Sequence, residues 1–162
     1  MNQPATLTTP GALRPVPIAE EAPEPPVRPV PIVEDEPETL TRPVLIVEDE
    51  PGLAEVLAVH LRASGYDPIV AHDGLEALYA LDRVTPLAVL LDLHLPHVSG
   101  FRLIQLLKQR SDMPRVPVIV LTALSFEEAQ DAVRAGADDF LTKPFLPAEV
   151  VTRVSRLIER LG

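Results

Sequence analysis

The sequence predicts an α/β fold in which a parallel sheet is doubly wound, with helices on both of its faces. From Arg42 onward, short apolar runs alternate with longer amphipathic ones, which is the pattern of strands joined by crossover helices. Two of the short runs, residues 87–91 and 116–121, are wholly apolar and lack polar alternation. Such runs are typical of strands buried on both faces of a parallel sheet. Right-handed crossovers then cover both faces of the sheet with helices.

Five strands follow from the apolar runs and the turn residues between them. The third run ends abruptly on a carboxylate, Asp92. Pro86 before it, and Pro96 with Gly100 after it, favour a short strand over a buried helix segment. The predicted strands cover residues 44–47, 66–71, 87–92, 116–121 and 139–142.

Five helices are predicted between and after these strands. Pro51 suits a first helical position, Asp73 and Ser125 suit N-caps, and Gly65 and Gly136 suit helix ends. The predicted helices cover residues 51–64, 74–83, 100–109, 126–135 and 147–161. Their spacing predicts these inward faces: Leu53, Val56, Leu57, His60 and Leu61; Leu75, Leu78 and Leu81; Phe101, Ile104 and Leu107; and Val150, Val154, Leu157 and Leu161.

Composition narrows the function classes. The net charge of -10 argues against a general nucleic-acid or anionic-membrane surface, because such surfaces are bound through excess Lys and Arg. The absence of Cys excludes disulfides, thiolate metal sites and a Cys nucleophile. The chain starts without a basic and apolar leader, and no run approaches the roughly 18 apolar residues of a membrane span. We therefore expect a cytoplasmic protein.

The first 41 residues differ from the rest and contain 10 of the 19 prolines. We expect an extended, largely disordered acidic tail over residues 1–41 and one folded domain over residues 42–162. A motif recurs every 14 residues at Arg14, Arg28 and Arg42, and the last copy has Leu45 where the earlier copies have proline. The copies indicate either a duplication that lengthened the tail, or a segment that competes with the third copy or presents extended strands to a partner.

Polar side chains gather where the predicted strands end: Glu48 and Asp49, then Asp92, Thr122 and Lys143. In a parallel sheet these strand ends share one edge, where ligands bind. Three converging carboxylates would repel one another unless a cation intervenes, and Mg²⁺ is a hard cation that prefers oxygen ligands. An aspartate nucleophile, a metal, an ammonium and a hydroxyl are together suited to phosphoryl transfer onto a carboxylate. Singly, each has a simpler explanation, such as an acidic helix entrance, a strand-end residue or a solvated loop lysine.

The region from about residue 42 to 161 resembles a response-regulator receiver domain, the signalling partner of histidine kinases. Four motifs carry the resemblance: Val-Leu-Ile-Val-Glu48-Asp49-Glu, Val-Leu-Leu-Asp92-Leu-His-Leu-Pro-His-Val-Ser-Gly100, Val-Ile-Val-Leu-Thr122-Ala, and Gly-Ala-Asp-Asp-Phe140-Leu-Thr-Lys143-Pro-Phe. The resemblance implies a flavodoxin-like sheet with strand order 2-1-3-4-5, and a cis Lys143–Pro144 bond.

The resemblance also implies roles for individual residues. Asp92 would accept a phosphoryl group from a kinase phosphohistidine, with Thr122 and Lys143 contacting that group. Asp49 and Asp92 would ligate Mg²⁺ directly, Glu48 through water, and His94 through its backbone carbonyl. Phe140 would swing inward as Thr122 moves. The His94 side chain and Leu124 would tune access to the phosphorylated site.

These expectations define a function and its partners. We expect a stand-alone phosphoacceptor, not an enzyme, that signals by phosphorylation-dependent protein binding or phosphorelay. Its partners would be a histidine kinase or histidine phosphotransfer protein, and a protein target on the face formed by Phe126–Ala135, Asp139–Thr142 and Pro147–Leu161, without direct nucleic-acid or membrane contact. A weak homodimer is an additional expectation.

Rival functions remain at this stage. A degenerate receiver acting as a phosphorylation-independent scaffold would carry the same fold. A dehalogenase-type phosphohydrolase would require a second aspartate where His94 stands. A nucleotide or flavin domain would require a phosphate-binding loop in place of the acidic residues 48–50.

Overall fold

The computed structural model describes residues 11, 41–111, 114–123 and 125–161. The predicted tail, apart from Gly11 and Thr41, lies outside the described residues, as does the proposed tuning residue Leu124. The division into tail and folded domain therefore stays a prediction. Among the described helices, none has the length and apolar character needed to cross a membrane.

Five parallel strands form a single sheet in the order β2-β1-β3-β4-β5. This order confirms the predicted doubly wound topology. The strands are β1 (Pro43–Val47), β2 (Asp67–Ala71), β3 (Ala88–Asp92), β4 (Val118–Thr122) and β5 (Asp139–Thr142). Every residue of β1, β3 and β4 is buried, because these three strands are central and helices cover both faces. Their unbroken apolar sequences have this origin.

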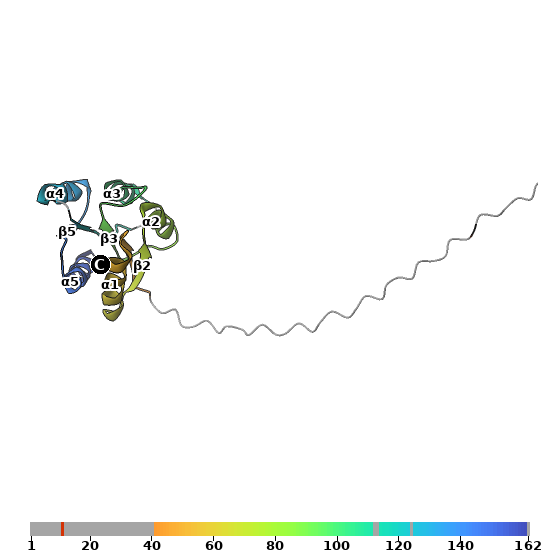
Figure 1. Cartoon of the computed structure of the whole chain (residues 1–162), viewed down its shortest axis with the longest axis horizontal. Helices are drawn as coiled ribbons and strands as arrows, with labels where there is room; N and C mark the ends of the chain where they lie inside the picture. Colours follow the sequence, from red (N-terminus) through yellow and green to blue (C-terminus); the bar gives the residue numbers. More distant parts are fainter. Residues whose placement is uncertain (1–10, 12–40, 112–113, 124, 162) are drawn as a thin grey trace, which may run out of the picture. The chain divides into compact units, whose positions relative to one another are not determined.

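Helices form a layer on each side of the sheet (Figure 1). They are α1 (Pro51–Ala63), α2 (Gly74–Leu81), α3 (Gly100–Gln109), α4 (Phe126–Ala135) and α5 (Pro147–Leu161). Alternate residues of β1 belong to different cores: Leu45 and Val47 pack with α2 and α3, whereas Val44 and Ile46 pack with α1 and α5. The period-two alternation of strand side chains thus separates the two cores.

The predicted helix ends are confirmed by their local geometry. The Asp73 side chain accepts a hydrogen bond from the Glu76 N–H at 2.8 Å, and Ser125 forms a capping box with Glu128. Gly136 closes α4 with φ of 122°, a conformation that side-chain-bearing residues rarely adopt. These caps start and end the helices close to where the sequence predicts.

Parts of the predicted inward faces are wrong. Val56 and His60 of α1 and Leu75 of α2 are exposed, and Leu161 is exposed at the end of α5. The buried stripe of α1 is Ala54, Leu57, Ala58 and Leu61. The small alanine side chains let α1 pack close to the sheet. The prediction considered only the large apolar residues, so the buried stripe of α1 is rotated relative to the predicted one.

Candidate functional site

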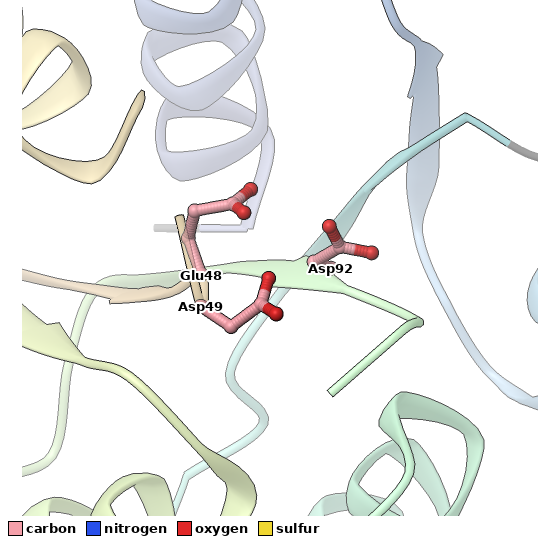
Figure 2. A group of neighbouring side chains, drawn as sticks. All are labelled: Glu48, Asp49 and Asp92. Carbon is pink, nitrogen blue, oxygen red and sulfur yellow. The ribbon is translucent and has the colours of Figure 1, made fainter. Parts of the chain in front are cut away.

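The ends of β1 and β3 bring three carboxylates together. Glu48 and Asp49 follow β1, and Asp92 is the last residue of β3, the strand beside it. Carboxylate oxygens of the three residues all lie within 4.8 Å of one another, and Figure 2 shows them gathered where the two strands end. The predicted convergence of the three carboxylates is confirmed. They meet because neighbouring parallel strands end at the same edge of the sheet.

Lys143 reaches this cluster from the loop after β5. Its Nζ donates hydrogen bonds to Glu48 Oε2 at 2.9 Å and to Asp92 Oδ2 at 2.6 Å. Its main-chain N–H donates to the Thr122 carbonyl at 2.8 Å, and the following Lys143–Pro144 bond is cis, as the resemblance implies. Residues from the ends of four strands are thereby held in one contact network.

Burial strengthens the electrostatic interactions in this network. Glu48 and Thr122 are fully buried and Asp92 is nearly so, whereas Asp49 is exposed. Burial raises the pKa of Glu48, although its hydrogen bond from Lys143 opposes that rise. For Lys143, burial alone disfavours the charged form, but the hydrogen bonds to Asp92 and then Glu48 outweigh it, so the pKa is raised. The ammonium therefore stays charged beside its two carboxylates.

The backbone after β3 fixes the orientation of Asp92. The His94 N–H donates to Asp92 Oδ1 at 2.9 Å. At Gly100, the first residue of α3, an added Cβ would lie 2.6 Å from the Asp92 carbonyl oxygen and from Leu93 Cα. The start of α3 therefore packs directly against the chain that carries Asp92. The side chains of His94 and His97 are exposed in this loop.

Thr122 and Phe140 lie on the neighbouring strands β4 and β5. Thr122 is buried at the last position of β4, and Phe140 is half-buried in β5. The Phe140 ring contacts that of Phe126, the first residue of α4, edge to face with centroids 6.0 Å apart. In the register of β4 and β5, Phe140 lies opposite Val120. The Phe140 ring therefore stands two residues before the level of the buried Thr122 hydroxyl.

The donor set fits a hard divalent cation. Glu48, Asp49 and Asp92 each contribute a carboxylate oxygen within one small volume, and Mg²⁺ is bound in proteins by one or two carboxylates together with water. The exposure of Asp49 leaves the site open to solvent water. These three residues are therefore the ones that could hold the metal.

One neighbour of the site was missed in the sequence. The His72 ring Nδ1 lies 3.1 Å from the Glu48 carbonyl oxygen, and the His72 N–H donates to Glu76 Oε2 at 2.7 Å. These contacts tie the turn after β1 to the start of α2. His72 directly follows β2, so the rule that polar residues at strand ends converge could have found it.

Residues 44–155 match the family model described as the response regulator receiver domain. The chain belongs to this family. Receiver domains are phosphoacceptors of two-component signalling and bind Mg²⁺ in the active site, which agrees with the acidic cluster at the ends of β1 and β3.

Two relatives show the extent of the receiver-domain match. The probable transcriptional regulatory protein TcrX of Mycobacterium tuberculosis is 43% identical over 111 residues, which are 68% of this chain and 47% of TcrX. The DNA-binding response regulator MtrA of the same species is 40% identical over 111 residues, covering 67% of this chain and 46% of MtrA. The receiver region matched here thus spans about half the length of these curated relatives.

Solved receiver domains agree with the fold. The Francisella response regulator 1452 receiver domain has a TM-score of 0.70 and 32% identity, covering 75% of this chain and 100% of that one. The receiver domain of the sensor histidine kinase PA1611 from Pseudomonas aeruginosa has a TM-score of 0.67 and 32% identity, covering 74% and 98%. That structure is described with a magnesium ion coordinated in the active-site cleft.

The predicted partner set is contradicted on nucleic acid. We expected protein partners and no direct nucleic-acid contact, but MtrA is named as a DNA-binding response regulator and TcrX as a transcriptional regulator. The expectation rested on the acidic charge of this chain. A receiver domain that matches about half of a relative carries no information on the charge of the other half, so that reasoning was wrong.

Proposed function

We propose that this receiver domain accepts a phosphoryl group on Asp92 from the phosphohistidine of a histidine kinase, in a Mg²⁺-dependent reaction. The observation that carries the proposal is the pair of hydrogen bonds from Lys143 to Asp92 and Glu48. These hydrogen bonds support the proposal because they place an ammonium beside the acceptor carboxylate, in the acidic cluster at the ends of the strands. The chemistry needs only residues of the described domain, whether or not a DNA-binding region such as that named for MtrA accompanies it.

In the proposed step, a carboxylate oxygen of Asp92 attacks the phosphorus atom of the phosphohistidine. The new O–P bond forms as the P–N bond breaks, and the imidazole nitrogen leaves with the bonding electron pair. Lys143 shifts from the Asp92 carboxylate to a phosphoryl oxygen and neutralises the charge that develops there. Once the acyl phosphate has formed, the Thr122 hydroxyl donates a hydrogen bond to a second phosphoryl oxygen.

Four groups would hold the metal in this proposal. Asp49 and Asp92 would bind it directly, Glu48 through water, and His94 through its carbonyl oxygen. Mg²⁺ bound there would supply positive charge to offset the negative charge of the phosphoryl oxygens. Lys143 already forms ion pairs with two carboxylates, those of Glu48 and Asp92. A second positive charge is therefore needed to neutralise the phosphoryl group when it binds.

Phosphorylation would change the surface around Phe140. The phosphoryl group adds about 1.5 to 2 negative charges, which draw Thr122 inward and free space for the half-buried Phe140 ring. Its present contact with the exposed Phe126 ring would then be lost. Shifting a switch from mostly off to mostly on needs about 5.5 kcal/mol of differential stabilisation, and several charge-assisted hydrogen bonds at about 1.5 to 3 kcal/mol each suffice.

The test is to incubate the full chain with Mg²⁺ and a small-molecule phosphodonor and to follow intact mass. The Asp92→Asn variant keeps the shape of the side chain and removes the nucleophile. The matched control is Asp73→Asn. Asp73 follows the carboxyl end of β2, and its carboxylate caps the start of α2.

We expect a single phosphoryl mass shift in the wild type and in Asp73→Asn, and none in Asp92→Asn. Two-dimensional NMR should show the Thr122 and Phe140 signals moving with the label. If the wild type binds Mg²⁺ and stays unlabelled, the scaffold alternative replaces this proposal. Labelling of Asp92→Asn at the wild-type rate would also overturn it.

A further inference from the structure

The first turn of α2 lies against two segments that the proposed metal site uses. The His72 ring, just before α2, lies 3.1 Å from the Glu48 carbonyl oxygen in the turn after β1. Gly74, the first residue of α2, packs against Val98 in the loop after β3. That loop begins at Asp92, the last residue of β3. The start of α2 therefore contacts both of the segments whose carboxylates converge.

Gly74 occupies a position without room for a side chain. It is buried, and a Cβ there would lie 2.5 Å from Val98 Cβ and 2.7 Å from the Val98 carbonyl oxygen. Glycine is needed here for space, because Gly74 is helical and is not among the glycines with positive φ. The main chain at the start of α2 thus touches Val98 directly, and no flexible side chain lies between them to absorb a displacement.

The loop after β3 is held by its own main-chain hydrogen bonds. The Val98 N–H donates to the Pro96 carbonyl at 2.8 Å, around His97 with φ of 66°. The Gly100 N–H donates to the Leu93 carbonyl at 3.2 Å and closes the loop. A loop closed in this way moves as a unit, so a shift of Val98 shifts the residues on either side of it.

The contact continues from Val98 to the acceptor residue. Gly100 follows Val98 by two residues, and a Cβ on Gly100 would lie 2.6 Å from the Asp92 carbonyl oxygen. The Asp92 carboxylate in turn accepts a hydrogen bond from the His94 N–H at 2.9 Å. Main chain therefore packs on main chain from the start of α2 to Asp92. Close-packed interiors transmit displacements along such contacts.

His72 holds the other segment of the site. A carbonyl oxygen can only accept a hydrogen bond, so the His72 ring Nδ1 donates to the Glu48 carbonyl. The Glu48 N–H donates to the Ala71 carbonyl at 3.0 Å. Both main-chain groups of Glu48 are thus bound by the junction of β2 and α2. The His72 N–H donates to Glu76 Oε2 at 2.7 Å, which links this junction to the first turn of α2.

We propose that the first turn of α2 is a positioning element for Mg²⁺. His72 acts through the Glu48 main chain and Gly74 acts through Val98, and together they set the separation of the two segments that would bind the metal. This inference rests on the proposed function, which supplies the metal-binding roles. Mg²⁺ demands near-ideal octahedral geometry, so its affinity depends on how the ligands are spaced. Groups that orient metal ligands commonly change metal affinity by about 10- to 100-fold.

The first test is a Mg²⁺ titration of the full chain, without a phosphodonor, followed by NMR shifts. His72→Ala removes the hydrogen bond to the Glu48 carbonyl, and the fold should persist because His72 is exposed. The matched control is His60→Ala. The exposed His60 ring makes the same kind of bond, from Nδ1 to the Val56 carbonyl at 2.8 Å, within α1. We expect Mg²⁺ binding about 10-fold weaker in His72→Ala and unchanged in His60→Ala.

The second test replaces Gly74 by Ala, with Gly52→Ala as the control. Gly52 also lies in the first turn of a helix, but a Cβ there meets nothing within 4 Å. We expect Mg²⁺ binding about 10-fold weaker in Gly74→Ala and unchanged in Gly52→Ala. In the metal-free protein, the His94 amide should exchange faster in Gly74→Ala, because the loop after β3 is displaced. Adding Val98→Gly removes the nearest contact and should restore part of the affinity.

Wild-type Mg²⁺ affinity in His72→Ala, or in a folded Gly74→Ala, would overturn the proposal. Equal weakening in the two control variants would also overturn it, since any small change in these helices would then have the same effect. If Gly74→Ala does not fold, His72→Ala decides. A wild type that binds Mg²⁺ and is labelled on Asp92, beside variants of unchanged affinity, refutes the positioning role alone. A wild type that neither binds Mg²⁺ nor becomes labelled refutes the proposed function.

Discussion

Lys143 Nζ lies 2.6 Å from Asp92 Oδ2 and 2.9 Å from Glu48 Oε2, so one ammonium joins the ends of β5, β3 and β1. The two carboxylates come from neighbouring strands and are buried. In this structure the positive charge of the Lys143 side chain offsets the repulsion between the two carboxylates. The contact therefore couples the acceptor to the loop that follows β5.

Replacing Lys143 by Met should slow phosphoryl labelling of Asp92 about 100-fold, the usual cost of removing one group that stabilises a developing oxyanion. The rate is measured by intact mass with the small-molecule phosphodonor. The matched control is Lys108→Met, because Lys108 is as exposed as Lys143 (24% against 22%) but binds Asp138 instead. Equal slowing by both substitutions would contradict a specific role for Lys143.

Asp49→Asn should weaken Mg²⁺ binding about 10- to 100-fold while leaving the fold intact. Asp49 is exposed, so its charge contributes little to stability, whereas loss of a carboxylate ligand weakens a hard-cation site directly. Binding is measured by following NMR shifts of the residues after β1 during a Mg²⁺ titration. The control is Asp67→Asn. Asp67 is the first residue of β2 and lies at the edge of the sheet away from the site, so this variant should bind Mg²⁺ as the wild type does. Unchanged affinity in Asp49→Asn would show that the metal lies elsewhere.

Gly100→Ala should destabilise the domain by about 1–3 kcal/mol and slow labelling of Asp92. The added Cβ would lie 2.6 Å from main-chain atoms of Asp92 and Leu93, so the strand end or α3 must move. Gly52→Ala is the control, because a Cβ there meets nothing within 4 Å and lies in α1. Urea unfolding gives the stabilities. A neutral Gly100→Ala would mean that α3 moves away without affecting Asp92.

The carboxylate of Asp138, whose side chain is only 3% exposed, predicts how stability depends on pH. Asp138 accepts hydrogen bonds from the Val118 N–H, from Lys108 and from Arg115. Burial alone would raise its pKa, but the Val118 N–H bond and then Lys108 outweigh burial and lower the pKa below its ordinary value of 3.8. The ionised form therefore contributes stability above pH 3.8, and that contribution is lost as pH falls through the lower folded value.

Asp138→Asn should accordingly be less stable than the wild type by about 1.5–3 kcal/mol at pH 7, and this difference should begin to shrink as pH falls below 3.8. Urea unfolding at pH 7 and pH 3 measures both differences. Asp131→Asn is the control, since its ion pair with Arg134 is exposed on both sides and is worth at most about 1 kcal/mol. A difference between Asp138→Asn and the wild type that is the same size at pH 3 as at pH 7 would point to packing instead of charge.

Much of the site could be predicted because parallel strands end at one edge. Asp92 and Thr122 were found as polar residues that terminate apolar runs, and their convergence needed only the strand order. The contacts of Lys143 could not be predicted in this way, because a loop lysine has several rotamers and no periodic pattern restricts its direction. His72 was missed because its role is made by a ring nitrogen next to the Glu48 carbonyl, a contact that requires the register of β1 and β2.

The sequence by itself determined the order of strands and helices, their caps, and which residues stand at the strand ends, since these depend on local periodicity and on turn chemistry. Only the tertiary structure decided which face of each helix is buried, as with exposed Leu75 beside buried Ala77, and which carboxylates share Lys143. It also decided that an apolar groove lies between β2 and α2. Helix rotation, strand neighbours and side-chain contacts depend on how distant segments pack, and no local pattern encodes that packing.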